Sequence, residues 1–91
     1  MPTILIAYDL APGSDYQPLH AAIKALGSSW WHHLDSTWLV KTNKSPKEVR
    51  EQLKPLVGAQ SELLVIDVTS RSRAWMQFSE RGSKWLKDTY E

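Results

Sequence analysis

The apolar and polar positions along the chain follow two periods, which predict a series of strands and helices. Residues 3–8 are apolar or β-branched and a Pro-Gly turn follows them, so they predict a first strand. Apolar residues then recur at helical spacing over residues 15–26, with Ser14 or Asp15 as N-cap and Gly27 as a stop signal. Two aromatic or β-branched runs within residues 29–42 meet at Asp-Ser, which indicates a hairpin.

The second half of the chain predicts another helix, a strand and a last helix. Residues 45–48, Ser-Pro-Lys-Glu, form a capping box with proline at the first helical position, and Pro55 predicts a kink or an early end of that helix. Residues 62–69 predict a fourth strand, and residues 79–90 predict a last helix that Gly82 weakens. The order is therefore βαββαβ with a C-terminal helical appendage.

This order predicts an α+β fold of the ferredoxin-like type, in which two helices cover one face of a four-stranded antiparallel sheet. We expect a ferredoxin-like domain over residues 1–70. Residues 71–91 are then an extension that packs on the domain or on its dimer partner.

Length and composition narrow the class of protein. Ninety-one residues suffice for one small domain with a thin core, and 42% hydrophobic residues exclude a disordered chain. No apolar run approaches the roughly 20 residues that span a bilayer, and we expect no signal peptide. The chain has no cysteine, which excludes disulfides and thiolate chemistry. We therefore expect a cytoplasmic protein without a membrane partner.

Alternation within the strands predicts a second apolar face of the sheet. Successive residues of a strand point to opposite faces, and two helices cover only one of them. The uncovered face would expose a contiguous patch, which predicts a homodimer joined through this face or by strands of the C-terminal segment. The alternative is that the last helix folds back over it. The predicted patch consists of Leu5, Ala7, Leu39, Leu63 and Val65.

The charge of the chain excludes binding of nucleic acid by bulk charge alone, because the net charge is only +1. Basic residues gather in residues 41–54 and 71–91, where a solvated helix face is the alternative explanation of the first block. We expect any binding to be weak and salt-sensitive. The candidate phosphate contacts are Lys44, Lys47, Arg71 and Arg73.

Asp9 is the candidate for catalysis and for metal binding. It ends the first strand, where a carboxylate could hold Mg²⁺ or Mn²⁺, and two copies across a dimer axis would form a clamp. The alternative is that Asp9 caps the following loop or helix. Asp67 falls at the far end of an antiparallel strand pair, so we do not expect it to be a second ligand. His32 and His33 are adjacent and point to opposite faces of a strand, so they cannot share one metal ion.

Five tryptophans are many for so small a core. Aromatic rings on a sheet stack bases in several single-strand binders, but the hairpin lacks interleaved arginines and lysines. We therefore assign Trp31 and Trp38 to core packing and dimer contact.

Two segments resemble a known family. Ile4–Leu10, an apolar strand that ends in Tyr-Asp, resembles the first strand of the small ferredoxin-like subunit of CRISPR spacer acquisition, a family similar to the VapD toxin ribonucleases. Asp35–Val40 resembles a variant of that family's Ser-Val-Phe-Glu strand. Trp30–Val40 as a block more closely resembles small uncharacterised bacterial proteins labelled SinR-like, a branch of the same superfamily.

The resemblance covers residues 3–70 and implies a homodimer that engages nucleic acid, with Asp9 as the metal ligand of a phosphodiesterase. Two features depart from the family: residues 16–20 contain no arginine, and Leu39 stands where the family has glutamate. Many family members act only as dimeric scaffolds. Two hypotheses follow, a nuclease that uses Mg²⁺ or Mn²⁺ and a non-catalytic dimeric module that binds nucleic acid or a partner protein.

Overall fold

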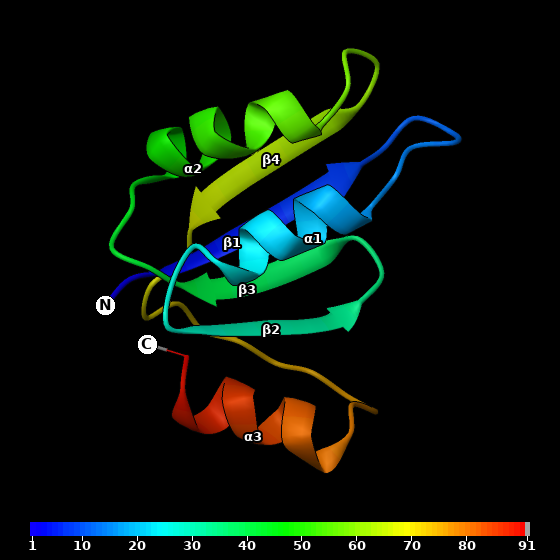
Figure 1. Cartoon of the computed structure of the whole chain (residues 1–91). Helices are drawn as coiled ribbons and strands as arrows, with labels where there is room; N and C mark the ends of the chain where they lie inside the picture. Colours follow the sequence, from blue (N-terminus) through cyan, green and yellow to red (C-terminus); the bar gives the residue numbers. More distant parts are fainter. Residues whose placement is uncertain (91) are drawn as a thin grey trace.

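The computed structural model describes residues 1–90 as three stacked layers (Figure 1). The middle layer is an antiparallel sheet in the order β2-β3-β1-β4, so the predicted α+β class with a four-stranded antiparallel sheet is confirmed. None of the helices within residues 1–90 has the length and apolarity needed to cross a membrane. The elements are β1 (Thr3–Asp9), α1 (Gln17–Lys24), β2 (Ser29–Leu34), β3 (Thr37–Lys41), α2 (Pro46–Leu53), the 3-10 helix η1 (Lys54–Leu56), β4 (Glu62–Asp67) and α3 (Glu80–Asp88).

Local signals place the ends of α2 as predicted. The Ser45 hydroxyl accepts from the N–H of Glu48 at 3.2 Å, and the Glu48 carboxylate accepts from the N–H of Ser45 at 3.0 Å, which completes the capping box. These hydrogen bonds lower the pKa of Glu48. Pro55 ends the α-helix, which continues only as η1.

The start of α1 differs from the prediction. Neither Ser14 nor Asp15 is the N-cap; that position belongs to Tyr16, which makes no capping hydrogen bond through its side chain. The Asp15 carboxylate instead accepts from the N–H of Gln17 at 3.0 Å, an arrangement that satisfies the same helix end from one residue further out.

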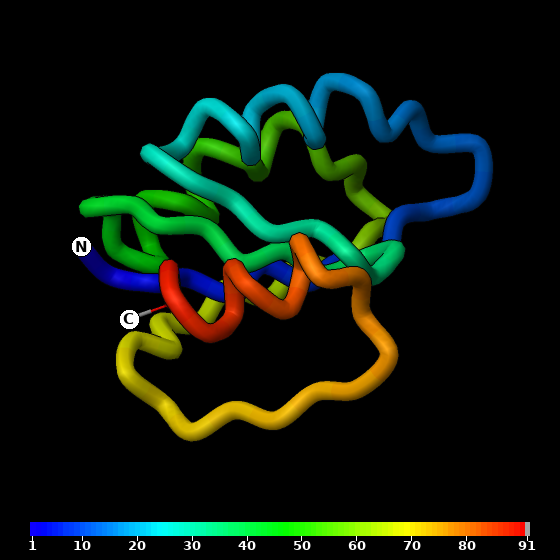
Figure 2. The backbone as a smooth tube through the Cα atoms, turned by 90° about the horizontal axis from the view of Figure 1, so that it is seen from below, coloured from blue at the N-terminus to red at the C-terminus, as the bar shows by residue number. Residues whose placement is uncertain are grey.

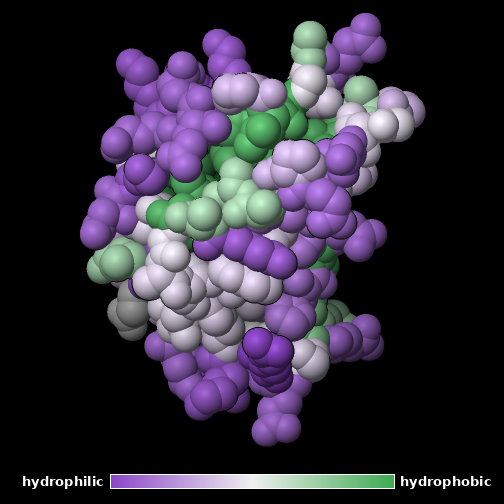
Figure 3. Space-filling model, viewed as in Figure 1, coloured by the Kyte–Doolittle hydropathy of each residue, from purple (hydrophilic) through white to green (hydrophobic). Residues whose placement is uncertain are grey.

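The main core lies between the sheet and helices α1 and α2. In Figure 3, seen from the helix side, the apolar surface is a strip between the two helices, and polar side chains surround it. Burial of this cluster is the main favourable term that holds both helices on the sheet. Its members are Ile4, Ile6, Tyr8, Leu19, Ile23, Leu26, Trp38, Val40, Val49, Leu53 and Val57.

The register of β4 corrects the predicted placement of Leu63 and Val65. They lie opposite Tyr8 and Ile6, so they face the helices and pack against the main core instead of lying beside Leu5. The prediction was wrong because the register of a strand, which alternation alone does not fix, decides which of its two residue sets faces which side.

The C-terminal segment covers much of the second face, which was the alternative outcome for the predicted patch. Helix α3 lies under the β2 side of the sheet, as Figure 2 shows. Leu39 is buried in a second cluster with Trp31, Leu86 and Tyr90, and Leu5 packs against it half-buried. Ala7 is also half-buried. The predicted patch is therefore largely an interior surface of the monomer.

Hydrogen bonds from tryptophans hold α3 against β2. The indole N–H of Trp31 donates to the carbonyl of Gly82 at 3.2 Å, and that of Trp85 donates to the Ser29 hydroxyl at 2.6 Å. A Cβ on Gly82 would lie 3.2 Å from the ring of His33, so glycine permits the close approach of helix and strand. The residue that weakens α3 locally thus serves its packing.

Candidate functional site

Two carboxylates lie side by side where β1 ends and β4 begins. Asp9 is exposed, and the register of β1 and β4 places it directly opposite Glu62, which the sequence alone did not single out. Residues opposed in this way have Cβ atoms about 5 Å apart and project from one face. The two like charges repel, and a divalent cation between them would remove the repulsion. Ser61 fixes the loops here, since its hydroxyl accepts from the N–H of Ala11 at 2.8 Å.

Asp67 lies at the other end of β4, opposite Ile4, as predicted. Its carboxylate accepts from the N–H and the hydroxyl of Thr69 at 2.9 and 2.5 Å, and these hydrogen bonds lower the pKa of Asp67. Asp67 therefore closes a turn and takes no part in the Asp9 pair. Across residues 1–90, no three histidine, aspartate or glutamate side chains gather as a metal-binding group. One chain thus offers a metal ion two carboxylates at this point.

A chain of hydrogen bonds links α1 to the hairpin on the helix side of the sheet. The indole N–H of Trp38 donates to the Tyr8 hydroxyl at 3.0 Å, and that hydroxyl lies 2.9 Å from Nε2 of His20. Because an indole can only donate, the Tyr8 hydroxyl accepts from Trp38, and it either donates to Nε2 of a His20 protonated on Nδ1 or accepts from a protonated Nε2. Burial lowers the pKa of His20, and the nearby His32 and Lys24 lower it further. These effects favour the neutral form of the His20 ring.

His32 and His33 lie on opposite faces of β2, as predicted. The ring of His32 stacks on Trp38 with centroids 3.9 Å apart, and its Nδ1 donates to the carbonyl of Thr37 at 3.1 Å. His33 lies on the α3 side, where its ring is 6.2 Å from that of Phe78. The two rings cannot hold one metal ion.

The free edge of β2 forms a groove of about 500 Å³, which we call the β2-edge groove. Trp30 is 41% exposed here, and the ammonium of Lys24 lies 4.9 Å from the centre of its ring. Arg81, exposed on the first turn of α3, lines the same groove. No acidic residue lines it. The lining residues are Ser28, Ser29, Trp30, Trp31, His32, His33, Arg81 and Trp85.

The β2-edge groove has cations beside an exposed aromatic ring, whereas the hairpin sequence contains no interleaved arginines or lysines. Lys24 of α1 stands only six positions before Trp30, whereas Arg81 of α3, 51 positions after it, is brought to the groove by the fold. A half-exposed indole flanked by cations can stack a base while the cations contact its phosphates.

The four cations predicted to contact phosphate do not surround Asp9. Lys44 lies just after β3 and Arg71 just after β4, and both strands end beside the start of β1, about 20 Å of strand from Asp9. Lys47 is exposed on the first turn of α2. Arg73 donates through Nε to a backbone carbonyl of α3 at 2.7 Å, so it also fixes the C-terminal segment.

No protein-family model, no curated protein and no solved structure matches this chain.

Proposed function

We propose that this protein binds single-stranded nucleic acid in the β2-edge groove. The observation that carries the proposal is the exposed Trp30, with the Lys24 ammonium over its ring and Arg81 lining the same groove, which no acidic residue lines. Stacking on one ring and pairing with two cations is a small set of contacts, so the affinity is in the micromolar range and the sequence preference is weak. The low net charge of +1 agrees with modest affinity.

Replacing Trp30 with alanine is expected to weaken binding of a 12-nucleotide oligo(U) or oligo(dT) about tenfold, because one base loses its stacking partner. Arg81→Gln is expected to weaken it several-fold and to reduce the dependence of affinity on salt. Fluorescence anisotropy at several salt concentrations measures both. Lys54→Gln, which removes an equal charge from the exposed surface of η1 outside the groove, is the matched control. Equal affinities of Trp30→Ala and the parent protein would contradict the proposal.

The protein is proposed to act as a homodimer with a ferredoxin-like chain order. The βαββαβ order of its elements and the strand order β2-β3-β1-β4 support that assignment. The surface that supports dimerisation is the part of the second sheet face that α3 leaves open. There Leu64 and Ile66 of β4 are 53% and 43% exposed, next to Leu5 and Ala7 of β1.

Leu64→Asp is expected to give a folded monomer, because the Leu64 side chain is exposed in one chain and buried only between two; its melting temperature falls only by the share that dimerisation contributes. Val65→Asp should instead destabilise the fold, since Val65 packs against the main core. Sedimentation at tens of micromolar and thermal unfolding distinguish the two effects. A parent protein that sediments as a single chain rules out the homodimer.

A metal-dependent phosphodiesterase is the second candidate, and the pairing of Asp9 with Glu62 favours it. A hard divalent cation prefers anionic oxygens, and a dimer would supply a second pair of carboxylates. Such a site would use Mg²⁺ or Mn²⁺ to stabilise the charge that develops on a phosphodiester during hydrolysis.

If the protein cleaves nucleic acid, Asp9→Asn and Glu62→Gln are each expected to reduce cleavage at least 100-fold, because each amide is nearly isosteric but neutral. Asp67→Asn, at the far end of β4, is the matched control and should cleave like the parent. Single-turnover cleavage of labelled RNA and DNA under Mn²⁺, with a chelator control, measures the effect. If Asp9→Asn cleaves as fast as the parent, the activity lies elsewhere. If the parent cleaves nothing, the non-catalytic dimeric module becomes the leading hypothesis.

A further inference from the structure

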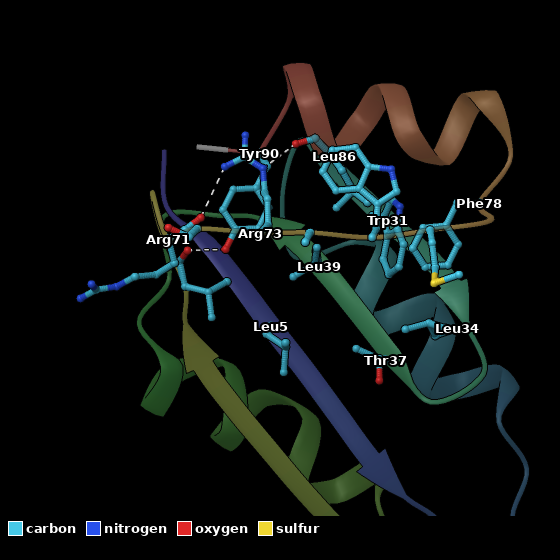
Figure 4. A pocket seen from close by; sticks show the side chains of 15 residues that line it. Leu5, Trp31, Leu34, Thr37, Leu39, Arg71, Arg73, Phe78, Leu86 and Tyr90 are labelled. Carbon is cyan, nitrogen blue, oxygen red and sulfur yellow. Dashed lines mark hydrogen bonds between the residues drawn. The ribbon is translucent and has the colours of Figure 1, made fainter.

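An apolar hollow of about 500 Å³ lies between the second face of the sheet and the C-terminal segment (Figure 4). We call the connection from β4 to α3, residues 68–79, the strap. Leu5 and Leu39 form the floor of the hollow, α3 closes one side, and the strap passes over it. The lining residues are Leu5, Trp31, Leu34, Thr37, Leu39, Val68, Arg71, Ser72, Arg73, Ala74, Trp75, Met76, Phe78, Leu86 and Tyr90.

The strap is anchored to the rest of the chain at several points, so the hollow is preformed. The Tyr90 hydroxyl donates to the carbonyl of Val68 where the strap begins. Further along, the indole N–H of Trp75 donates to the Ser83 hydroxyl at 3.2 Å, and near its end Phe78 meets Trp31 edge-on with ring centroids 5.0 Å apart. Between these anchors the backbone bows away from the sheet (Figure 2).

The charged residues that line the hollow are arginines and lie at one end. Asp67 lies near them outside the lining, since burial raises the pKa of Tyr90 and Asp67 raises it further. Arg71 and Arg73 line it, and no acidic residue does. Arg73 lies over the ring of Tyr90, with Cζ 4.3 Å from the ring centroid, and donates through Nε to the carbonyl of Leu86 at 2.7 Å. These contacts fix its guanidinium while leaving most of its five N–H donors for another partner. Leu34 and Phe78 lie at the opposite end (Figure 4).

We propose that this hollow binds a small amphipathic carboxylate, with its apolar body over Leu5 and Leu39 and its carboxylate against Arg73 and Arg71. The volume is in the range of pockets that bind small molecules, about 300–1,000 Å³. The lining excludes water from an aliphatic chain or a ring, and a guanidinium forms its strongest hydrogen bonds with a carboxylate. This site is separate from the β2-edge groove and from Asp9, and its occupancy does not depend on either.

Three straight-chain probes of similar chain length and different head group test the proposal on the full chain: decanoate, 1-decanol and decyltrimethylammonium. Calorimetry gives their affinities, and ¹H–¹⁵N spectra locate the site through the indole N–H signals of Trp31 and Trp75 and the amides of Leu5 and Leu39. Decanoate is expected to bind at least about tenfold more tightly than decanol, because the alcohol lacks the negative charge and the second acceptor oxygen that a guanidinium binds in a carboxylate. The ammonium should bind most weakly.

Variants assign the contacts. Arg71→Gln is expected to weaken decanoate about threefold, as suits an exposed partner, and Arg73→Gln about tenfold, with decanol unaffected by either. Leu5→Phe narrows the hollow and should weaken the binding of decanoate and of decanol, whereas Leu56→Phe, the same change at an exposed leucine of η1 outside the hollow, should weaken neither. Thermal unfolding verifies that each variant is folded. Equal affinities for the three probes, no binding of any, or shifts confined to Leu64 and Ile66 would each overturn the proposal.

Discussion

Gly27→Ala is expected to lower the free energy of unfolding by about 3 kcal/mol, a large share of the stability of a domain this size. A Cβ at this position would lie 1.7 Å from the carbonyl oxygen of Lys41, which is backbone and cannot turn away. The same carbonyl accepts from the N–H of Ser28 at 3.1 Å, and the Thr42 hydroxyl donates to the carbonyl of Leu26 at 2.8 Å. The end of α1 and the end of β3 must therefore move apart.

Thermal unfolding measures this effect, and a change of about 3 kcal/mol corresponds to roughly 15 °C for a domain of this length. Gly58→Ala is the matched control, because the nearest heavy atom to its added Cβ is a serine hydroxyl 4.0 Å away. Gly58→Ala should melt within a few degrees of the parent. If Gly27→Ala also melts within a few degrees of the parent, the ends of α1 and β3 do not approach each other as closely as described.

Leu86→Ala is expected to lower the free energy of unfolding by about 3 kcal/mol and to destabilise the whole chain, not α3 alone. Leu86 is 5% exposed and packs with Trp31, Leu39 and Tyr90, so its truncation leaves a cavity against the sheet itself. Denaturant unfolding gives the free energy, and hydrogen exchange compares the amides of α3 with those of β1.

Lys87→Ala, at the next and exposed position, is the control and should change the free energy of unfolding by less than about 0.5 kcal/mol. The decisive result is the exchange pattern of Leu86→Ala. Loss of protection in α3 with unchanged protection in β1 would mean that the C-terminal segment is an independent appendage, and the cooperative unit would then end near residue 70.

Local signals in the sequence were sufficient to predict those features that one short segment determines by itself. The hairpin turn at residues 35–36, the capping box at Ser45 and the stop at Pro55 all depend on neighbours within four residues. The opposite orientation of His32 and His33, and the distance of Asp67 from Asp9, needed only the alternation and direction of strands.

Contacts between segments that are remote in the chain could not be predicted from the sequence. The placement of Leu63 and Val65 failed because the register between β1 and β4 is set by packing of both strands on the helices. The same register places Glu62 beside Asp9, 53 positions away in the chain. Arg81, which lines the groove that Trp30 lines, comes from α3, 51 positions away, so no window of the hairpin sequence contains it.

The charges at the two ends of β4 bear on the solubility of the protein. β4 is an edge strand. Lysine and proline commonly protect an edge strand from pairing with further strands, and β4 contains neither. Antiparallel pairing of two copies about the strand centre would place Glu62 of each copy opposite Asp67 of the other. Hydrogen bonds from Thr69 keep Asp67 ionised to lower pH than usual. Acid–acid repulsion at both ends therefore protects this apolar edge from aggregation at neutral pH, and the protection weakens in strong acid or at high salt.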